Sequence, residues 1–164
     1  MTTGDEGIFP VSDVNIRLAQ LSDRDQLVRF REALWPNATV KEHAQELTLI
    51  LEGNLPLTMP LVILVAQTED RTLAGFLEID LRSHADGFNP SRPVGYVEGW
   101  YVAESHRNRG IGRKLVAAAE DWARSQGCVE IASDTWIENE VSQRAHKALG
   151  YEVVDRCVHY RKTL

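Results

Sequence analysis

The chain of 164 residues has only two cysteines, Cys128 and Cys157, and no long apolar run. Neither C-x-x-C spacing nor a histidine cluster accompanies the cysteines, so we expect reduced thiols and no metal site. The longest apolar run, Leu61–Ala66, is far too short to span a bilayer. The first residues are acidic and small, so we expect no secretory signal. These absences favour a cytoplasmic protein that has no membrane partner.

Positive charge is also scarce, since 18 Lys and Arg residues face 24 Asp and Glu residues for a net charge of −6. This balance argues against a nucleic-acid partner and mildly favours a cationic substrate. A composition that is 43% hydrophobic and 26% charged is typical of a globular protein. The length corresponds to one domain, which we place at residues 15–164 after a flexible leader over residues 1–14.

Hydrophobic periodicity predicts strands and helices in alternation. The predicted strands are Asn15–Leu18, Leu61–Thr68, Leu73–Leu81, Val94–Val102 and Val129–Ser133, with two short ones around Tyr151–Val154 and Val158–Arg161. The predicted helices run from Asp23 to Pro36, from Val40 to Glu52, from Ile111 to Gln126 and from Glu138 to Leu149. We therefore expect an α/β (α+β) fold in which a mixed sheet is covered by helices on both faces.

A loop rich in glycine and arginine precedes the third predicted helix. Gly110 and Gly112 are spaced G-x-G and are flanked by Arg107, Arg109 and Arg113. Glycine lets the backbone approach a ligand closely, and the N–H groups of a first helical turn favour an anion. No Gly-Lys-Ser/Thr follows, and the third glycine of a dinucleotide fingerprint is absent. The loop thus predicts a pyrophosphate site of another kind.

The pattern Arg107-x-x-Gly110-x-Gly112 resembles the loop of the GNAT superfamily of N-acetyltransferases that holds the pyrophosphate of acetyl-coenzyme A. A second motif of that family has an Asn, a Tyr seven positions later and Gly-Phe after eleven and twelve positions. Here Asn139 is followed by His146 and by Gly150-Tyr151 at these spacings. The usual tyrosine, which lies near the coenzyme sulfur, is therefore a histidine in this chain.

Further segments are similar to one subfamily, the single-domain bacterial aminoglycoside 6′-N-acetyltransferases. They are Leu34-Trp35-Pro36, Val97-Glu98-Gly99, the run from Ala132 to Tyr151 and Tyr160-Arg161-Lys162. The resemblance implies the GNAT fold, a mixed and mostly antiparallel sheet of six or seven strands flanked by about four helices. It also implies transfer of the acetyl group of acetyl-CoA to the 6′-amine of an aminoglycoside, which confers resistance. Similar enzymes are homodimers that exchange C-terminal strands.

The resemblance implies site residues as well. The coenzyme positions correspond to Trp100, Tyr101, Val102, Arg107, Asn108, Arg109, Gly110, Ile111, Gly112, Arg113, Asn139 and His146. The drug positions correspond to Trp35, Glu98, Asp134 and Asp155, and Glu138 adds a neighbouring carboxylate. The family also contributes an aromatic from the loop after its third strand. That position falls at about Ala85, so either Phe88 substitutes for the aromatic or the contact is missing.

Carboxylates suit a substrate that carries several ammonium groups. We predict that Glu98 is the general base, because a carboxylate within a central strand is costly unless a cleft or an ion pair stabilises it. A salt bridge to a core arginine is the alternative. Asp134 follows a strand, where open α/β sheets bind ligands, or else caps the next helix. Asp155 has the alternative of being an ordinary surface acid.

The predicted chemistry is direct attack in a ternary complex, because neither cysteine has an evident His or Asp partner. Backbone N–H groups near Val102 would polarise the thioester carbonyl. The thiolate would be protonated by solvent or by His146, which alternatively only packs in the coenzyme channel. Two other functions stay open. One is acetylation of another amine, such as a polyamine, peptide or lysine, and the other is a non-catalytic module that binds acetyl-CoA.

Overall fold

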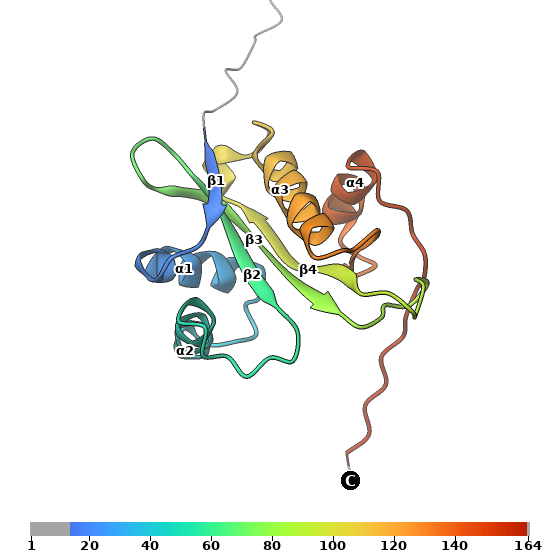
Figure 1. The fold of residues 1–164 in the computed structure, drawn as a ribbon. Helices are drawn as coiled ribbons and strands as arrows, with labels where there is room; N and C mark the ends of the chain where they lie inside the picture. The colour runs from blue at the N-terminus through green and yellow to red at the C-terminus, as the bar shows by residue number, and fades with distance from the viewer. Residues whose placement is uncertain (1–13, 164) are drawn as a thin grey trace, which may run out of the picture.

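The computed structural model describes residues 14–163, which form a five-stranded sheet between two layers of helices (Figure 1). The strands lie in the order β1-β2-β3-β4-β5. They are β1 (Asn15–Leu18), β2 (Leu61–Gln67), β3 (Leu73–Arg82), β4 (Val94–Val102) and β5 (Ile131–Ser133). β1 to β4 pair antiparallel, whereas β5 is parallel to β4.

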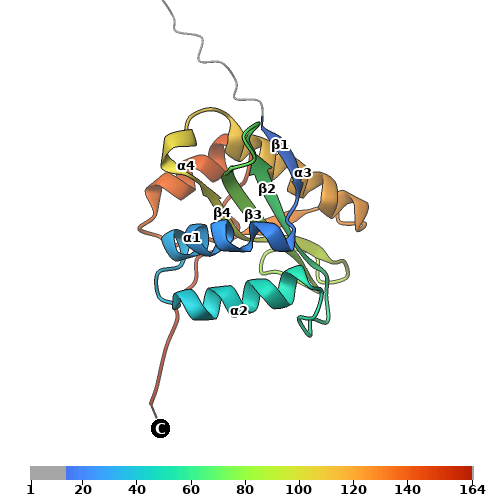
Figure 2. The same ribbon diagram turned by 90° about the vertical axis from the view of Figure 1, so that its left-hand side faces the viewer.

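The helices divide between the two faces of the sheet. α1 (Arg24–Leu34) and α2 (Val40–Leu51) lie on one side of the sheet in Figure 1, and α3 (Ile111–Ser125) and α4 (Glu140–Ala148) lie on the other. Figure 2, turned by a quarter, shows α1 and α2 side by side in front of the strands. Two 3₁₀ turns, η1 (Leu21–Asp23) and η2 (Glu104–His106), precede α1 and the loop before α3.

Two hydrophobic cores lie on the two faces of the sheet, each covered by one layer of helices. β3, which is buried over Leu73–Ile79, contributes to both. Leu77, Ile79 and Leu81 pack on the α3 side, together with Leu115 and Ala119 of that helix. Phe76 packs on the other side with Leu27 of α1 and Leu47 of α2. The alternation of β3 side chains between the two faces therefore explains why its sequence is almost continuously apolar.

Local sequence signals set the helix boundaries. A capping box begins α2, because the Thr39 hydroxyl accepts from the Glu42 N–H and the Glu42 carboxylate accepts from the Thr39 N–H. Asp23, the residue before α1, does not cap that helix through its side chain. Its carboxylate instead accepts from the Gln20 N–H and pairs with Arg17 at 2.7 Å, which ties the turn to β1.

The predicted elements are confirmed from β1 to α4, with β4 identical in its bounds and β5 reduced to Ile131–Ser133. The prediction of two strands after residue 150 is wrong, because residues 151–163 carry no helix or strand. The sheet consequently has five strands rather than six or seven. A strand requires backbone partners, and the described part of the chain offers this segment none. Figure 1 shows the segment passing beside the loop between β3 and β4 before its end runs away from the body of the protein.

Other expectations are only partly open to comparison. The predicted leader lies outside the described residues, except for Val14, which packs against the core on the α3 side. Cys128 is buried as expected of a core thiol, but Cys157 is exposed in the C-terminal segment. Of the helices described, none is long and apolar enough to cross a membrane.

A buried ion pair fastens α1 to the sheet. Arg31 of α1 donates to both carboxylate oxygens of Glu78 of β3, over 2.5 and 2.6 Å, and both side chains are 3% exposed. A third bond of 2.7 Å runs from Arg31 to Glu46 of α2. Burial raises the pKa of Glu78, and the Arg31 guanidinium opposes that shift. Arg31 thus connects both helices of this layer to β3.

Replacing Arg31 by Met should destabilise the protein by about 3–5 kcal/mol, because the buried carboxylate of Glu78 would lose the guanidinium that compensates its charge. The double variant Arg31→Met/Glu78→Leu should recover most of that loss, since an apolar pair needs no compensating charge. Urea denaturation followed by circular dichroism measures both free energies of unfolding.

The matched control is Arg124→Met on α3, whose side chain is 63% exposed although it pairs with Glu120 and Asp121. We expect a loss below about 1 kcal/mol there. Equal losses at the two arginines would show that the buried pair has no special role.

Candidate functional site

A β-bulge places Glu98 on the face of the sheet that α1 and α2 cover. Glu78 pairs with Gly99 and Ile79 with Val97, so Glu98 is an extra residue of β4 with no partner on β3. Bulges re-aim side chains and are frequent beside active sites. Glu98 therefore shares a pocket with Glu78, whereas Trp100 packs on the opposite face with the α3-side core. The regular alternation of Glu98 with Trp100 that the sequence suggests is broken at this point.

Charged side chains of β3 continue the pocket beside Glu98. Glu78, Asp80 and Arg82 alternate along β3 and thus share one face. Arg82 forms an ion pair with Glu98 and lies 3.8 Å from the nearer oxygen of Asp80. The alternative interpretation of Glu98, a salt bridge to an arginine, is therefore also realised, but at 31% exposure of the Glu98 side chain rather than in the core.

The pocket has a volume of about 520 Å³ and is strongly acidic. Its lining comprises Arg31, Trp35, Ala38, Glu42, His43, Glu46, Leu61, Glu78, Asp80 and Glu98. Five carboxylates face one arginine in this lining, and that arginine, Arg31, is already bound to two of them. A concave site with surplus negative charge attracts a cation.

Trp35 forms a flat wall of this pocket. It follows α1, and its ring meets Phe76 edge to face at a centroid distance of 6.3 Å. The Arg31 guanidinium lies 5.3 Å from the Trp35 ring centroid, and His43 contacts the Trp35 carbonyl at 3.1 Å. Gly99 allows this position, because a Cβ at residue 99 would overlap the indole ring.

Tyr96 links Glu98 to Asp134, the predicted drug residue after β5. The Arg82 guanidinium stacks 3.3 Å from the Tyr96 ring centroid. Burial raises the pKa of Tyr96 to about 12, and the neighbouring Asp134 carboxylate adds to the shift. The Asp134 and Glu98 carboxylates therefore both lie near enough to Tyr96 to raise its pKa.

β4 and β5 separate directly beyond the acidic pocket. Their pairing covers only Gly95–Val97 on β4, although β4 continues to Val102. The Ser133 hydroxyl donates to the Val97 carbonyl at the point of separation. Along Trp100–Val102 the edge of β4 therefore forms no ladder with β5, which leaves backbone groups available to an extended ligand.

The loop before α3 adopts the geometry expected of an anion site. Asn108 and Gly110 both have positive φ, 60° and 74°, and Gly110 is the residue before α3. Such turns direct successive N–H groups to one side. The N–H groups of Ile111, Gly112 and Arg113 have no partner within an α-helix, and the first turn holds no acidic residue. A side chain at residue 112 would collide with Trp100 at 2.6 Å, so this helix end must pack closely on β4.

Two of the loop arginines already bind the protein backbone. Arg107 donates to the Val102 carbonyl at 3.0 Å, and Arg113 donates to the Ala148 carbonyl at 3.2 Å. The first bond fixes the loop to the end of β4, and the second ties α3 to the end of α4. Arg109 is exposed. The geometry thus assigns anion binding to the backbone of the loop more directly than to its arginines.

His146 of α4 packs against Trp100 of β4 and Ser133 of β5, where these two strands separate. Its Nδ1 lies 2.8 Å from the Ser142 carbonyl, and its Nε2 lies 3.0 Å from the Ser133 hydroxyl. Its ring meets Trp100 and Tyr151 edge to face, at centroid distances of 5.9 and 5.2 Å. Both ring nitrogens therefore have protein partners, as a packing role requires, while Ser133 connects the imidazole to the point where β4 and β5 separate.

The remaining predicted residues lie apart from the acidic pocket. Asn139 caps α4, where its side-chain oxygen accepts from the Ser142 N–H at 3.1 Å. Glu138 is exposed just before it, and Asp155 is exposed in the C-terminal segment. Tyr101 faces α1 and packs against Phe30 at a centroid distance of 5.2 Å. Within residues 14–163, no three His, Cys, Asp or Glu side chains are grouped to hold a metal ion.

The loop between β3 and β4 touches the C-terminal segment. A Cβ on Gly87 of this loop would lie 2.9 Å from Val154. Trp136, which follows β5, also contacts the segment and meets His159 edge to face at a centroid distance of 6.3 Å. Ala85 and Phe88 belong to this loop and are partly buried. The structure thus leaves the aromatic contribution of Phe88 as a prediction.

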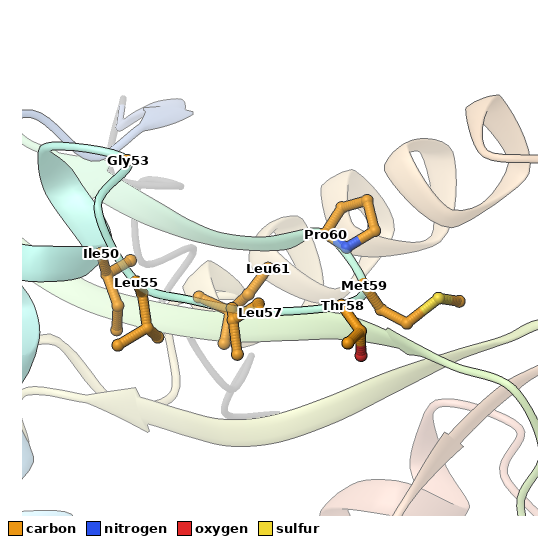
Figure 3. A pocket seen from close by; sticks show the side chains of 8 residues that line it. All are labelled: Ile50, Gly53, Leu55, Leu57, Thr58, Met59, Pro60 and Leu61. Atoms are coloured by element: carbon orange, nitrogen blue, oxygen red, sulfur yellow. The ribbon is translucent and has the colours of Figure 1, made fainter.

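A second hollow, of about 360 Å³, lies under the loop between α2 and β2 (Figure 3). Its lining is Ile50, Gly53, Leu55, Leu57, Thr58, Met59, Pro60 and Leu61. It contains no charged side chain and none of the predicted site residues. The charged side chains and the predicted site residues therefore lie in the acidic pocket and along β4 rather than in this hollow.

Asp80, Arg82 and Tyr96 are site residues that the sequence prediction missed. The signal for Asp80 and Arg82 was the period of two along β3, where charged residues alternate with apolar ones at Glu78, Asp80 and Arg82. Within a buried strand such a row indicates a polar cleft on one face. Glu42 and Glu46 gave no comparable signal, because charges on an exposed helix face are common.

Comparisons with known proteins agree with this geometry. The acetyltransferase (GNAT) family model matches residues 27–151. An aminoglycoside N(6′)-acetyltransferase type 1 from Klebsiella aerogenes is 38% identical over 149 residues, which cover 91% of this chain and 96% of that protein. The enzyme of the same name from Serratia marcescens is 38% identical over 147 residues, covering 88% and 97%.

Solved structures give the same result. An aminoglycoside N-acetyltransferase in complex with CoA aligns with a TM-score of 0.82 at 32% identity, over 93% of this chain and 97% of that one. A structure with the bisubstrate analog CoA-S-monomethyl-acetylneamine also has a TM-score of 0.82, at 32% identity over 93% and 100%. An aminoglycoside antibiotic 6′-N-acetyltransferase from Acinetobacter baumannii has a TM-score of 0.81 at 29% identity, over 93% and 99%.

Replacing Gly99 by Ala should displace Trp35 and destabilise the protein by about 1–3 kcal/mol, since the added methyl group overpacks the pocket wall. The displaced indole should also change the tryptophan emission of the folded state. Urea denaturation and fluorescence spectra test both effects.

Gly53→Ala is the control, because φ is +69° there but no atom lies within 4 Å of the added Cβ. It should cost about 1–2 kcal/mol from backbone strain and leave the emission unchanged. Identical spectra for wild type and Gly99→Ala would contradict the close contact of Gly99 with Trp35.

Proposed function

The chain belongs to the acetyltransferase (GNAT) family, and from that premise we propose that it transfers the acetyl group of acetyl-CoA to the 6′-amine of aminoglycoside antibiotics. Relatives that carry this activity in their names align over about nine tenths of the chain. The transfer would confer resistance to these drugs. The observation that carries the proposal is the acidic pocket, which meets the free edge of β4 at Glu98.

The pocket suits the proposed drug in charge and shape. Aminoglycosides carry several ammonium groups, so carboxylates provide their complementary charge and an indole face provides a flat contact. Glu98 and Trp35 line the pocket, and Asp134 lies near Tyr96 beside it. We assign drug binding to Trp35, Glu98 and Asp134, with Glu138 and Asp155 as outer carboxylates.

We assign acetyl-CoA to the opening between β4 and β5. The pyrophosphate would bind the N–H groups of the loop from Arg107 to Arg113, and the thioester arm would lie along Trp100–Val102. The N–H groups near Val102 would polarise the carbonyl oxygen of the thioester. Asn139 and His146 would line the same opening from α4. His146 is engaged by Ser142 and Ser133, so we propose that solvent rather than His146 protonates the leaving thiolate.

The chemistry requires a neutral amine. The substrate arrives as an ammonium ion, and we propose that Glu98 accepts its proton where the acidic pocket meets the opening between β4 and β5. The amine nitrogen then attacks the thioester carbonyl in a ternary complex, and the carbon–sulfur bond breaks with its electron pair on sulfur. The structure lends no support to an acyl-enzyme on cysteine, since Cys128 is buried and Cys157 lies in the C-terminal segment.

Thiol release from acetyl-CoA tests the proposal with two aminoglycosides, one bearing a 6′-amine and the other a 6′-hydroxyl. We expect turnover with the 6′-amine alone. Glu98→Gln should lower kcat/KM by about 100-fold or more, the usual contribution of a general base. Glu69→Gln, in the exposed β2–β3 turn, is the matched control and should retain full activity.

Other results would point to the alternatives. Turnover with polyamines or peptides but with neither drug would indicate a family member that acts on another amine. Binding of acetyl-CoA without turnover of any amine would indicate a non-catalytic module.

We also propose that the protein is a cytoplasmic homodimer. Apolar side chains of the C-terminal segment are exposed, with Val158 at 70% and Tyr160 at 93%, and Trp136 nearby is 74% exposed. A second copy that supplies a strand partner would cover these side chains and complete the backbone hydrogen bonds of the segment. Acetyl-CoA as a co-substrate and unpaired cysteines are consistent with the cytoplasm.

Light scattering coupled to size-exclusion chromatography should give twice the mass of one chain. Val158→Asp should yield monomers, because a charge would be buried at the interface. Thr163→Asp, which adds the same charge near the end of the segment, should remain dimeric. A monomeric wild-type protein at micromolar concentration would refute the dimer.

A further inference from the structure

Asp80 has an unsatisfied oxygen in the acidic pocket. Its Oδ1 is the one buried side-chain oxygen or nitrogen without a hydrogen-bond partner among residues 14–163. The Nε of Arg82 lies 3.8 Å away, which is beyond hydrogen-bond distance. A buried carboxylate oxygen without a donor is costly, so such an atom calls for an explanation. A proton on Asp80, donated to a neighbouring acceptor, would satisfy it.

Glu98 is that neighbouring acceptor. It lies one strand away, and the same Arg82 guanidinium forms its ion pair. Two carboxylates thus share one arginine, so one negative charge of the group is uncompensated. Like charges at short range favour protonation of one partner, as in other carboxylate pairs.

The groups around Asp80 and Glu98 do not supply the positive charge that would compensate the second carboxylate. The titratable and charged groups that face Asp80 from the helices are Arg31 of α1 and Glu42, His43 and Glu46 of α2. From the strands they are Glu78 and Arg82 of β3, and Tyr96 and Glu98 of β4. Arg31 is occupied by Glu78 and Glu46, and the remaining groups are mostly acidic.

We propose that Asp80 and Glu98 act as one proton-accepting pair, in which the proton taken from the substrate ammonium is held between Glu98 and Oδ1 of Asp80. This inference rests on the proposed function, and it adds Asp80 as the residue that positions the proton. The N–H bond of the ammonium breaks, and its proton joins the pair. The amine then forms its C–N bond to the acetyl carbon.

The proton balance closes without a further reactant. As the C–N bond forms, the nitrogen loses a second proton and the departing thiolate gains one. The proton held by the pair is released to solvent before the next cycle. The net reaction converts an ammonium ion and acetyl-CoA to an amide, CoA and one proton.

The electrostatics of Asp80 agree with this role. Burial and the charge of Glu98 raise the pKa of Asp80 to about 6, against the opposing effect of Arg82. A base whose pKa lies near the working pH is both largely unprotonated and strong enough to take a proton. The side chain is 24% exposed, so the proton can also leave to water.

The kinetic test uses Asp80→Asn, which preserves shape and removes the charge. We expect kcat to fall about tenfold or more with the 6′-amine drug, while KM for acetyl-CoA stays unchanged. The acid limb of the pH–rate profile near pH 6 should move to lower pH, because the carboxyl of Asp80 that titrates there would be absent. Adding Asp80→Asn to Glu98→Gln should lower kcat less than about twofold further, since the pair acts as a unit.

Asp121→Asn is the matched control, an acid of α3 with 79% side-chain exposure, and its profile should equal that of wild type. The proposal is overturned if Asp80→Asn keeps kcat within about twofold with an unmoved acid limb. A rise in the KM of the drug alone would also overturn it, since Asp80 would then only bind the substrate.

A second measurement needs no substrate. Carboxyl carbon NMR of the whole protein should show one aspartate that titrates near pH 6, that disappears in Asp80→Asn, and that moves to lower pH in Glu98→Gln. Titration of Asp80 near pH 4 would refute the pair even if the drug is acetylated. Titration near pH 6 in a protein that acetylates no aminoglycoside would refute the proposed function and leave the carboxylate pair in place.

Discussion

The extra residue in β4 determines how the two halves of the site meet. Because Glu98 has no partner on β3, the pairing of β4 with β3 shifts by one residue at this point and Glu98 turns toward α1 and α2. Two residues later Trp100 faces the other way, where it contacts Gly112 and His146. One strand thus presents a carboxylate to the acidic pocket and a free edge to the opening beside β5. A regular strand would have directed Glu98 and Trp100 to the same face.

The neighbouring strand β3 carries two carboxylates, Glu78 and Asp80, whose surroundings differ. Glu78 is fully buried and accepts two short bonds from Arg31, so its charge is completely paired. Asp80, two residues further, shares Arg82 with Glu98 and keeps an oxygen without a donor. The fully paired carboxylate of Glu78 holds α1 in place through Arg31. The carboxylates of Asp80 and Glu98, whose charges are only partly compensated, retain the capacity to bind a proton. The firm anchoring of Arg31 also keeps Trp35 in position, since its guanidinium packs against that ring.

Most of the fold could be predicted from the sequence, because long amphipathic segments and buried strands carry clear periodicity. The bounds of β4 were predicted correctly, and α2 was predicted to within one residue. The C-terminal strands were predicted wrongly, since the valines of that segment signal β-propensity but cannot specify a pairing partner. The site was accessible to prediction only in part. Glu98 stood out as a charge within an apolar run, but the bulge that orients it depends on the register of β3 against β4, which no local pattern encodes. Asp80 was not predicted, although it alternates with apolar residues. Its importance depends on its proximity to Glu98 of β4 and to Arg82, which the sequence pattern does not reveal.

The acidic pocket finally implies that this site is stabilised by what it binds. Since the pKa of Asp80 is raised to about 6 from an unperturbed value of 3.8, the folded protein holds more protons than the unfolded chain between these two pH values. Its contribution to stability is therefore favourable at low pH and is lost as the pH rises through about 6, where Asp80 ionises beside Glu98. A cationic ligand that binds only the folded state reverses that loss, because its charge replaces the missing proton. The surplus of negative charge that weakens the protein above this pH is thus the feature that the charge of a bound cation would compensate.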